Sequence, residues 1–283
     1  MNAAVDLEAL TGSAAAGSTP LGGTARRVEL ADGRVVVAKR HDHVTALRAE
    51  VAGLCWLAEP GVVPLPEVLG YDDEWIVMEL VEPGAPTAAG AEEFGRGLAR
   101  LHAAGAEAFG AAPPDGPVDA WIGLAPMRNE PGSSWPSWYA ARRVEPYLRS
   151  AVDRGVLSDG DVRAVESVCA RISSLAGPDE PPARLHGDLW SGNVRWAADG
   201  RAWLIDPAAH GGHRETDLAM LDLFGCARLD RIVAAYQEVT PLADGWRGRV
   251  GLHQLFPLLV HTVLFGGGYA GQAVAAARSA LRG

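Results

Sequence analysis

The chain divides into two parts with different secondary-structure patterns, and this division most limits the folds it can adopt. Before Pro83-Gly84, β-rich runs flank one segment, 44–58, whose apolar residues recur at helical spacing. After it, helical patterns predominate at 91–104, 134–155 and 159–176. We therefore predict an α+β fold with two lobes. Residues 1–81 would form a small antiparallel sheet with one helix, and 82–283 a larger, mainly helical lobe.

Charge and cysteine content narrow the class of protein. The net charge of −10 argues against a nucleic-acid-binding surface. The three cysteines are scattered without a CxxC pair, which fits a reducing compartment. The N-terminus has no signal pattern, and the longest apolar run is too short to cross a membrane. We expect a soluble, cytoplasmic protein that binds neither nucleic acid nor membrane, while the sequence leaves its oligomeric state open.

The segment RRVELADGRVVVAKR predicts a β-hairpin that turns at Asp32-Gly33. A two-residue turn places Val28 opposite Val37. Lys39 then shares the face of Val37, because side chains alternate along a strand. Lys39 is the only lysine in a chain that otherwise uses arginine. A compact ammonium at the end of an apolar strand therefore indicates a specific role.

The densest group of polar residues lies within residues 185–220, around a second turn at Asp199-Gly200. A two-residue turn there places Asn193 opposite Asp206, and directly opposed residues have Cβ atoms about 4.5–5.5 Å apart. Both side chains offer oxygen ligands, which suit Mg²⁺. Asp188 precedes Asn193 by five residues, as in the H-x-D-L-x-x-x-N loop of kinases. There the aspartate accepts the proton of the attacking hydroxyl.

Phosphoryl transfer also needs a cation on the nucleotide phosphates, held by a carboxylate from the next helix. Lys39 lies on a suitable strand, and Glu50 lies on the following helix. Arginine, with its wide planar group, would replace such a point charge poorly. We therefore predict that Lys39 and Glu50 bind the phosphates of ATP.

The remaining nucleotide contacts come from the sheet and the segment that follows it. Val28 and Val37 are predicted to cover the adenine. Met78 would lie at the back of the pocket, and the backbone groups of Glu79 and Val81 would face the purine edge. Residues 12–25 are Gly-rich and are read as a loop. Neither a Walker loop nor a G-x-G-x-x-G loop is present, so the looser stretch GSTPLGGTA within it is read as the loop over the phosphates.

Two other interpretations are weaker. His186, Asp188, His210 and His213 offer ligand types of a metal-dependent hydrolase. That interpretation leaves the strand lysine and the Asn193–Asp206 opposition unexplained. A catalytically silent nucleotide-binding protein has no support, because every residue needed for transfer is present.

At LHGDLWSGN, IDPA and GHRETDLAMLDLFG the sequence resembles the fructosamine kinase (ketosamine-3-kinase) family, within the aminoglycoside-phosphotransferase-like kinases. The resemblance implies a two-lobed, protein-kinase-like fold. It also implies ATP-dependent, magnesium-dependent phosphorylation of O3 of a ketosamine, either a fructosamine or a ribulosamine, with a role in deglycation. Asp188 would be the base and Asn193 and Asp206 the magnesium ligands.

The same resemblance implies an acceptor pocket lined by Trp190, Glu215 and His261. His210 stands where the family usually has an aromatic residue, which bears on the substrate more than on the reaction. A kinase for an aminoglycoside, choline or another small alcohol, with the same fold, is the main alternative. The sequence does not decide between a free small molecule and a glycated lysine on a protein as the acceptor.

Overall fold

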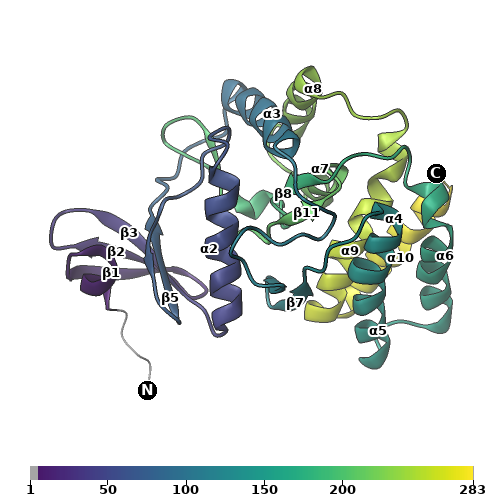
Figure 1. Ribbon diagram of the computed structural model, residues 1–283, viewed down its shortest axis with the longest axis horizontal. Helices are drawn as coiled ribbons and strands as arrows, with labels where there is room; N and C mark the ends of the chain where they lie inside the picture. Colours follow the sequence, from purple (N-terminus) through teal and green to yellow (C-terminus); the bar gives the residue numbers. More distant parts are fainter. Residues whose placement is uncertain (1–5, 283) are drawn as a thin grey trace.

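The computed structural model describes residues 6–282, whose elements form two parts around a central helix, α2 (Figure 1). The first part holds one sheet with strand order β1-β2-β3-β5-β4, antiparallel throughout. Its strands are β1 (Ala15–Gly22), β2 (Ala25–Leu30), β3 (Val35–Arg40), β4 (Val68–Tyr71) and β5 (Trp75–Glu79). The helix α2 (Val44–Ala58) lies between this sheet and the rest of the protein, and a short helix α1 (Leu7–Thr11) is an addition to the prediction.

The second part is mainly helical, as predicted. Its helices are α3 (Ala88–Ala103), α4 (Trp135–Tyr139), α5 (Glu145–Asp153), α6 (Asp159–Leu175), α7 (Glu215–Leu223), α8 (Leu229–Val239), α9 (Trp246–Phe265) and α10 (Gly267–Arg282). A π-helical turn (Ala140–Val144) joins α4 to α5. Three two-stranded sheets connect the helices: β6 (Asp119–Ile122) with β7 (Ala125–Arg128), β8 (Ala183–Leu185) with β11 (His210–Gly212), and β9 (Val194–Trp196) with β10 (Ala202–Leu204).

The two parts share a hydrophobic core. Leu47, Leu54 and Leu57 of α2 are fully or almost fully buried. They belong to a cluster that includes Met78 from β5 and residues from α3, α7 and α8. Burial of leucine side chains on this scale stabilises each by about 1.5–3 kcal/mol. Because α2 contributes to this core, its orientation relative to the helical part is set by packing.

No helix among residues 6–282 is both long enough and apolar enough to span a membrane. The boundary between the lobes near residue 81 stays a prediction. It falls in the segment between the end of β5 at Glu79 and the start of α3 at Ala88.

The predicted register of the first hairpin is wrong by one residue. Val28 pairs with Val36, and Val37 pairs with Arg27. The amide of Leu30 bonds the carbonyl of Arg34 at 2.8 Å, so the loop has three residues and ends at a left-handed glycine, Gly33, with φ of 90°. Val28 therefore lies on the sheet face opposite to Lys39, buried beside Leu7 of α1. The prediction that Val28 covers the adenine beside Val37 is wrong.

Residues 12–25 do not form the predicted open loop. Most of this segment is strand β1, which pairs with β2 from Ala15 to Gly22. Its small and polar residues are largely exposed, so no buried alternation marked it as a strand. Only the turn at Gly23 and Thr24 lies between β1 and β2. Thr24 lines a cavity between the sheet and the helical part.

Candidate active site

A cavity of ≈ 470 Å³ lies between the sheet part and the helical part. Five residues predicted for phosphoryl transfer line it together: Lys39, Glu50, Asp188, Asn193 and Asp206. They come from β3, α2, the loop after β8 and the segment after β10. A cavity of this size is typical of a small-molecule site. The residues thus converge although they are as much as 167 positions apart.

Lys39 connects the two parts through ion pairs. Its Nζ lies 2.8 Å from Oε2 of Glu50 and 3.0 Å from Oδ1 of Asp206. The Nε2 of His41 lies 2.9 Å from the same Glu50 oxygen. Burial opposes the charge of Lys39, but the two carboxylates outweigh it and raise the pKa of Lys39 above its ordinary value. The prediction that Glu50 holds the lone lysine thus agrees with the geometry.

Asn193 and Asp206 come together by a different route from the one predicted. In the β9–β10 hairpin Val194 pairs with Leu204, and the amide of Ile205 bonds the carbonyl of Asn193 at 3.1 Å. Asn193 therefore lies opposite Ile205, so the predicted register is wrong by one residue. Asp206 follows the strand in a left-handed conformation, with φ of 52°. This turn brings it to the cavity, where Asn193 Nδ2 lies 3.4 Å from its main-chain oxygen.

The donor set around Asn193 fits a magnesium ion. Its Nδ2 donates to the main-chain oxygen of Asp188 at 2.8 Å and to Oδ2 of Asp188 at 3.2 Å. With the amide nitrogen committed in this way, Oδ1 is left as the free ligand atom of Asn193. Asp206 contributes a carboxylate, and oxygen ligands of these types are those that Mg²⁺ prefers. Asn193 and Asp206 could hold the ion.

Asp188, the predicted base, lines the cavity in a buried environment. Burial raises the pKa of its carboxyl group to about 7, while the hydrogen bond from Asn193 acts in the opposite direction and the Asp206 charge adds to the rise. A carboxylate whose pKa lies near neutral pH is well suited to accept a proton from a hydroxyl group.

Asp217 of α7 contacts the backbone of the predicted catalytic loop, and the sequence analysis missed it. Its carboxylate accepts hydrogen bonds from the main-chain nitrogens of His186 at 2.8 Å and Gly187 at 3.0 Å. The Nε2 of His102 lies 3.2 Å from it. Asp217 is fully buried, and it fixes the backbone immediately before Asp188. The signal in the sequence was a carboxylate within the mostly apolar run TDLAM. Such a run predicts burial, and a buried carboxylate needs hydrogen-bond or ion-pair partners.

The chain matches the family model described as fructosamine kinase over residues 23–282. It is 36% identical over 240 residues, 84% of each chain, to the "Probable ketoamine kinase TTHA1179" of Thermus thermophilus. This chain belongs to the fructosamine kinase family. As a member of it, the protein is a phosphotransferase that acts on a hydroxyl group.

Solved structures agree with this membership. The crystal structure named "putative fructosamine-3-kinase" from Thermobifida fusca has a TM-score of 0.91 and 51% identity, covering 98% of this chain and 97% of that one. The choline kinase LicA of Streptococcus pneumoniae has a TM-score of 0.65 at 15% identity, with 98% and 96% coverage. This second likeness shows the fold alone, and it confirms the predicted two-lobed, protein-kinase-like architecture of this fructosamine kinase family member.

Among the predicted adenine contacts, Val37 and Met78 share the sheet face of Lys39, although neither lines the 470 Å³ cavity. Val37 pairs with Met78, and Lys39 pairs with the next residue on the same face, Ile76. The main-chain amide of Glu79 donates to the carbonyl of Glu67 at 2.9 Å. The main-chain carbonyl of Glu79 is therefore the backbone group of this residue that could accept a hydrogen bond from a purine. The roles of Val37, Met78, Glu79 and Val81 stay predictions.

The family resemblance implies that Trp190, Glu215 and His261 line the pocket for the acceptor substrate, and the structure places these three residues in different environments. Trp190 lines the cavity, and its side chain is 39% exposed. His261 reaches Trp190 through an intermediate ring: Phe224 lies 5.1 Å from His261 and 6.2 Å from Trp190, measured between ring centroids. In the lining of the same cavity, the ring of His43 stacks on that of Trp121, with 4.3 Å between centroids. Trp190 thus lines the cavity as expected, whereas His261 does not line it and lies behind Phe224.

Glu215 does not line the acceptor pocket, so that prediction is wrong. It is buried, and its two oxygens lie 2.9 and 2.5 Å from the Nε and Nη2 of Arg249. The sequence could not show this, because Arg249 is 34 residues away. Burial would raise the pKa of Glu215, but hydrogen bonds with His253 and Arg249 outweigh it and lower the pKa to about 2. Glu215 is thus a structural anion of the helical part.

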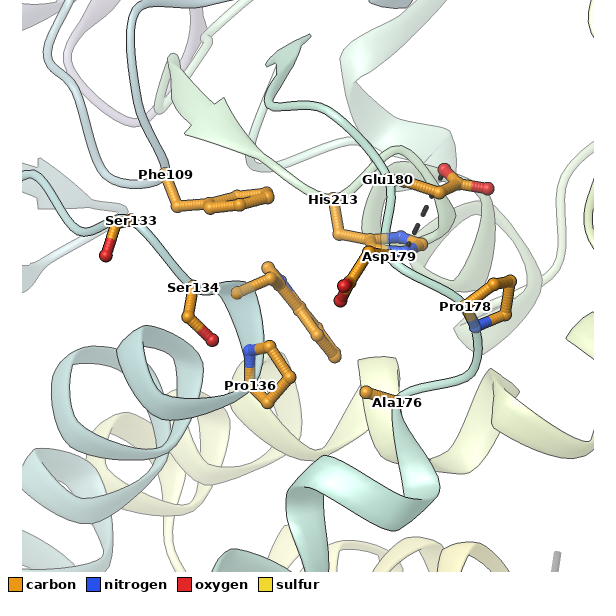
Figure 2. A pocket seen from close by; sticks show the side chains of 10 residues that line it. Phe109, Ser133, Ser134, Pro136, Ala176, Pro178, Asp179, Glu180 and His213 are labelled. Atoms are coloured by element: carbon orange, nitrogen blue, oxygen red, sulfur yellow. Dashed lines mark ion pairs between the residues drawn. The ribbon is translucent and has the colours of Figure 1, made fainter.

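The environment of Glu215 includes a second, smaller cavity of ≈ 260 Å³ (Figure 2). His213 lines it together with Phe109, Asp179 and Glu180. Ligand atoms of His213, Glu215 and His253 lie within 4.8 Å of one another. The Arg249 guanidinium already neutralises Glu215, however, so this cluster is poorly suited to a cation.

The set proposed for a metal-dependent hydrolase is not assembled. His186 and His210 each use a ring nitrogen on a main-chain carbonyl, of Ile205 and Ala208 respectively, both at 2.9 Å. Among residues 6–282, the only group close enough to hold a metal through histidine, cysteine or carboxylate ligands is the Glu215 cluster, which lacks Asp188. That interpretation is therefore wrong, and His186 has the structural role of bonding nearby backbone.

Proposed function

We propose that this protein transfers the γ-phosphoryl group of Mg·ATP to O3 of a ketosamine, a fructosamine or ribulosamine, as a step in deglycation. The observation that carries the proposal is the convergence of Lys39, Glu50, Asp188, Asn193 and Asp206 in one cavity beside an exposed tryptophan. Relatives named as a ketoamine kinase and a fructosamine-3-kinase support the acceptor. The three free cysteines fit a reducing, cytoplasmic setting.

The residues have separate roles in the proposed reaction. Lys39, oriented by Glu50, binds the nucleotide phosphates, and Val37 and Met78 contact the adenine. The magnesium ion held by Asn193 and Asp206 would neutralise phosphate charge. Asp188 binds the 3-hydroxyl, orients it for in-line attack and accepts its proton. The phosphoryl group passes directly between the two oxygens, so no covalent enzyme intermediate forms.

The lining of the cavity favours a ketosamine over the alternative acceptors. The rings of His41, His43, Trp121 and Trp190 line it. It also has four carboxylates, but Glu50 and Asp206 pair with Lys39 and Asp188 is the proposed base, which leaves Asp42 for a cationic acceptor. A multiply charged aminoglycoside would favour an open pocket dominated by carboxylates. The likeness to choline kinase concerns the fold, which hosts several acceptors.

A panel of acceptors tests the proposal. ADP release from Mg·ATP would be measured with a ribulosamine, a fructosamine, an aminoglycoside and choline, using Asp188→Asn as the blank. We expect selective turnover of the ketosamines, with mass spectrometry placing the phosphate on O3. Turnover of the aminoglycoside or choline alone, or phosphate on another oxygen, would refute the proposed substrate.

A further inference from the structure

The helix α2 begins without the side chains that usually stabilise a helix N-terminus. Its N-cap residue, His43, makes no side-chain hydrogen bond to the first turn, and the first turn holds no acidic residue. A serine, threonine, aspartate or asparagine at the N-cap would bond one of the unpaired main-chain amides, and a carboxylate would favour the positive end of the helix. Contacts from outside α2 therefore have to hold its first turn in place.

Trp121 of β6 supplies such contacts. Its Nε1 donates a hydrogen bond to Oγ1 of Thr45 at 3.0 Å. Its ring stacks on that of His43, with 4.3 Å between the centroids and 12° between the planes. The hairpin of β6 and β7 lies between α2 and α9 (Figure 1), and its residues Ile122 and Met127 belong to the core cluster that includes α9. Trp121 thus connects the first turn of α2 to the core of the helical part.

The rest of α2 is fixed to the helical part by other contacts. Arg184 of β8 donates from Nη1 to the main-chain oxygen of Trp56 at 2.7 Å and to Oε2 of Glu59 at 2.8 Å. In the middle of the helix, a Cβ atom added to Gly53 would lie only 3.2 Å from the ring of Pro207. The contacts of Trp121 therefore matter most for the turns of α2 that precede Gly53.

These first turns carry one wall of the catalytic cavity. His43, Ala46, Ala49 and Glu50 line the cavity, as their helical spacing on one face of α2 allows. Thr45 is not part of this lining. A shift of the first turn would move Glu50 relative to its partner on the sheet, the lone lysine. Thr45 can therefore affect the cavity only through the position of α2.

We propose that Trp121 is a positioning residue for the phosphoryl transfer: it fixes the first turns of α2, so that Glu50 holds Lys39 toward the phosphates of ATP. In protein kinases the corresponding ion pair depends on where the helix lies, and movement of that helix controls activity. Here contacts with the helical part hold α2 at both ends, so the pair is already formed in the folded protein. This inference rests on the proposed function, and it adds a residue of the β6–β7 hairpin to the machinery of the nucleotide site.

Substitutions at Thr45 test the role of Trp121 without changing the cavity lining. Thr45→Val keeps the branched shape but removes the hydroxyl that accepts the hydrogen bond, whereas Thr45→Ser keeps a hydroxyl. We expect the Kd for Mg·ATP, measured by titration calorimetry, to rise about two- to tenfold in Thr45→Val, the range for one net hydrogen bond. Thr45→Ser should stay close to the wild type.

The matched control is the same substitution at Thr11. Its hydroxyl donates to the main-chain oxygen of Leu7 at 2.7 Å, and Leu7 packs on the sheet face opposite to Lys39. Thr11→Val therefore removes a partly buried hydroxyl from the same part of the protein, and it should leave the Kd for Mg·ATP unchanged. An equal rise in Thr11→Val and Thr45→Val would mean that general destabilisation is the cause, which overturns the proposal.

Two double-mutant cycles identify the partner and the path. Trp121→Phe keeps a ring beside His43 but lacks the Nε1 donor, so its effect and that of Thr45→Val should not add, because both remove the same bond. In a Glu50→Gln background, Thr45→Val should raise the Kd less than it does in the wild type, because the effect passes through Glu50. Additive effects in either cycle would overturn the proposal.

Turnover of the ketosamines separates this inference from the proposed function. If the wild type binds Mg·ATP but phosphorylates no ketosamine, while Thr45→Val weakens ATP binding as expected, the positioning role stands and the proposed function fails. If the ketosamines are phosphorylated and Thr45→Val leaves the Kd for Mg·ATP unaltered, the proposed function stands and the positioning role of Trp121 fails. A loss in Thr45→Ser as large as that in Thr45→Val also overturns the positioning role.

Discussion

Replacing Lys39 with methionine tests the ion pairs of the cavity through stability rather than activity. The substitution removes the ammonium 2.8 Å from Glu50, a residue only 5% exposed, and leaves His41 as the remaining partner. Removing one partner of a buried ion pair costs about 3–5 kcal/mol, because the other charge stays buried. The side chain of Asp206 is 44% exposed and can be hydrated, so it adds little. With His41 retained, we expect a loss of about 3 kcal/mol in unfolding free energy at pH 7.

Urea denaturation of the wild type and variants would measure this loss, and an exposed pair provides the control. Arg48 and Asp73 form an ion pair whose side chains are 60% and 80% exposed. Arg48→Met should therefore cost less than about 1 kcal/mol. Adding Glu50→Gln to Lys39→Met should recover part of the loss, since it removes the uncompensated charge.

The loss should also depend on pH. In the wild type, burial would raise the pKa of Glu50, but Lys39 and His41 outweigh burial and lower it. Ionised Glu50 therefore stabilises the protein above its unfolded pKa of about 4.3, and this contribution is lost as pH falls through the folded pKa. Without Lys39, burial raises the pKa of Glu50, so the deficit of Lys39→Met should shrink between pH 7 and 5. A deficit that stays constant with pH, or equals that of Arg48→Met, would refute this account.

Four further substitutions test the site. Asp188→Asn should lower kcat by at least about 100-fold, the minimum for loss of a general base, while calorimetric ATP affinity is retained; normal turnover would contradict its assignment. Lys39→Arg keeps the charge but should lower kcat/KM for ATP, and an unchanged value would argue against a compact cation requirement. Asn193→Ala should raise the Mg²⁺ concentration that gives half-maximal activity about tenfold or more. An unchanged Mg²⁺ requirement would show that Asn193 is not a ligand of the ion. Asp217→Asn leaves one carbonyl oxygen where two carboxylate oxygens accept the amides of His186 and Gly187. It should lower the free energy of unfolding by about 1.5–3 kcal/mol and also lower kcat. A variant with the wild-type kcat and unfolding free energy would exclude a positioning role for Asp217.

The lysine, its helix partner and the catalytic loop could be predicted because their spacing is local. Lys39 ends an apolar strand, and Glu50 follows on the next helix. Asp188 and Asn193 lie within one loop of fixed spacing. None of these predictions needed the distance between the two parts of the protein, which packing of α2 determines.

The two hairpin registers could not be obtained from the Asp-Gly dipeptide alone. Both turns share the sequence Ala-Asp-Gly-Arg, at 31–34 and 198–201, and both form three-residue loops. In each, the aspartate accepts the amide of the following arginine, at 3.0 Å for Asp32 and 2.9 Å for Asp199. The left-handed glycines have φ of 90° and 85°. The dipeptide Asp-Gly is compatible both with this three-residue loop and with a two-residue turn, so it does not determine the register. In this protein the tetrapeptide Ala-Asp-Gly-Arg marks the three-residue loop.

Glu215 and Asp217 show that the role of a buried carboxylate cannot be predicted from the sequence around it. They lie two residues apart in α7, so they face different sides of the helix, and both are buried. One pairs with Arg249 and the other supports the catalytic loop. Their partners come from remote segments, and the sequence of α7 contains nothing that distinguishes the two roles.

The bonds from His186 and Gly187 to Asp217 affect when the catalytic loop becomes ordered. Because the acceptor is a core helix rather than a ligand, the loop backbone loses its conformational entropy during folding and not in each catalytic cycle. These two amides should exchange with solvent deuterium as slowly as the core of α7, whether or not nucleotide is present. Binding of nucleotide therefore does not have to supply the free energy of ordering this loop.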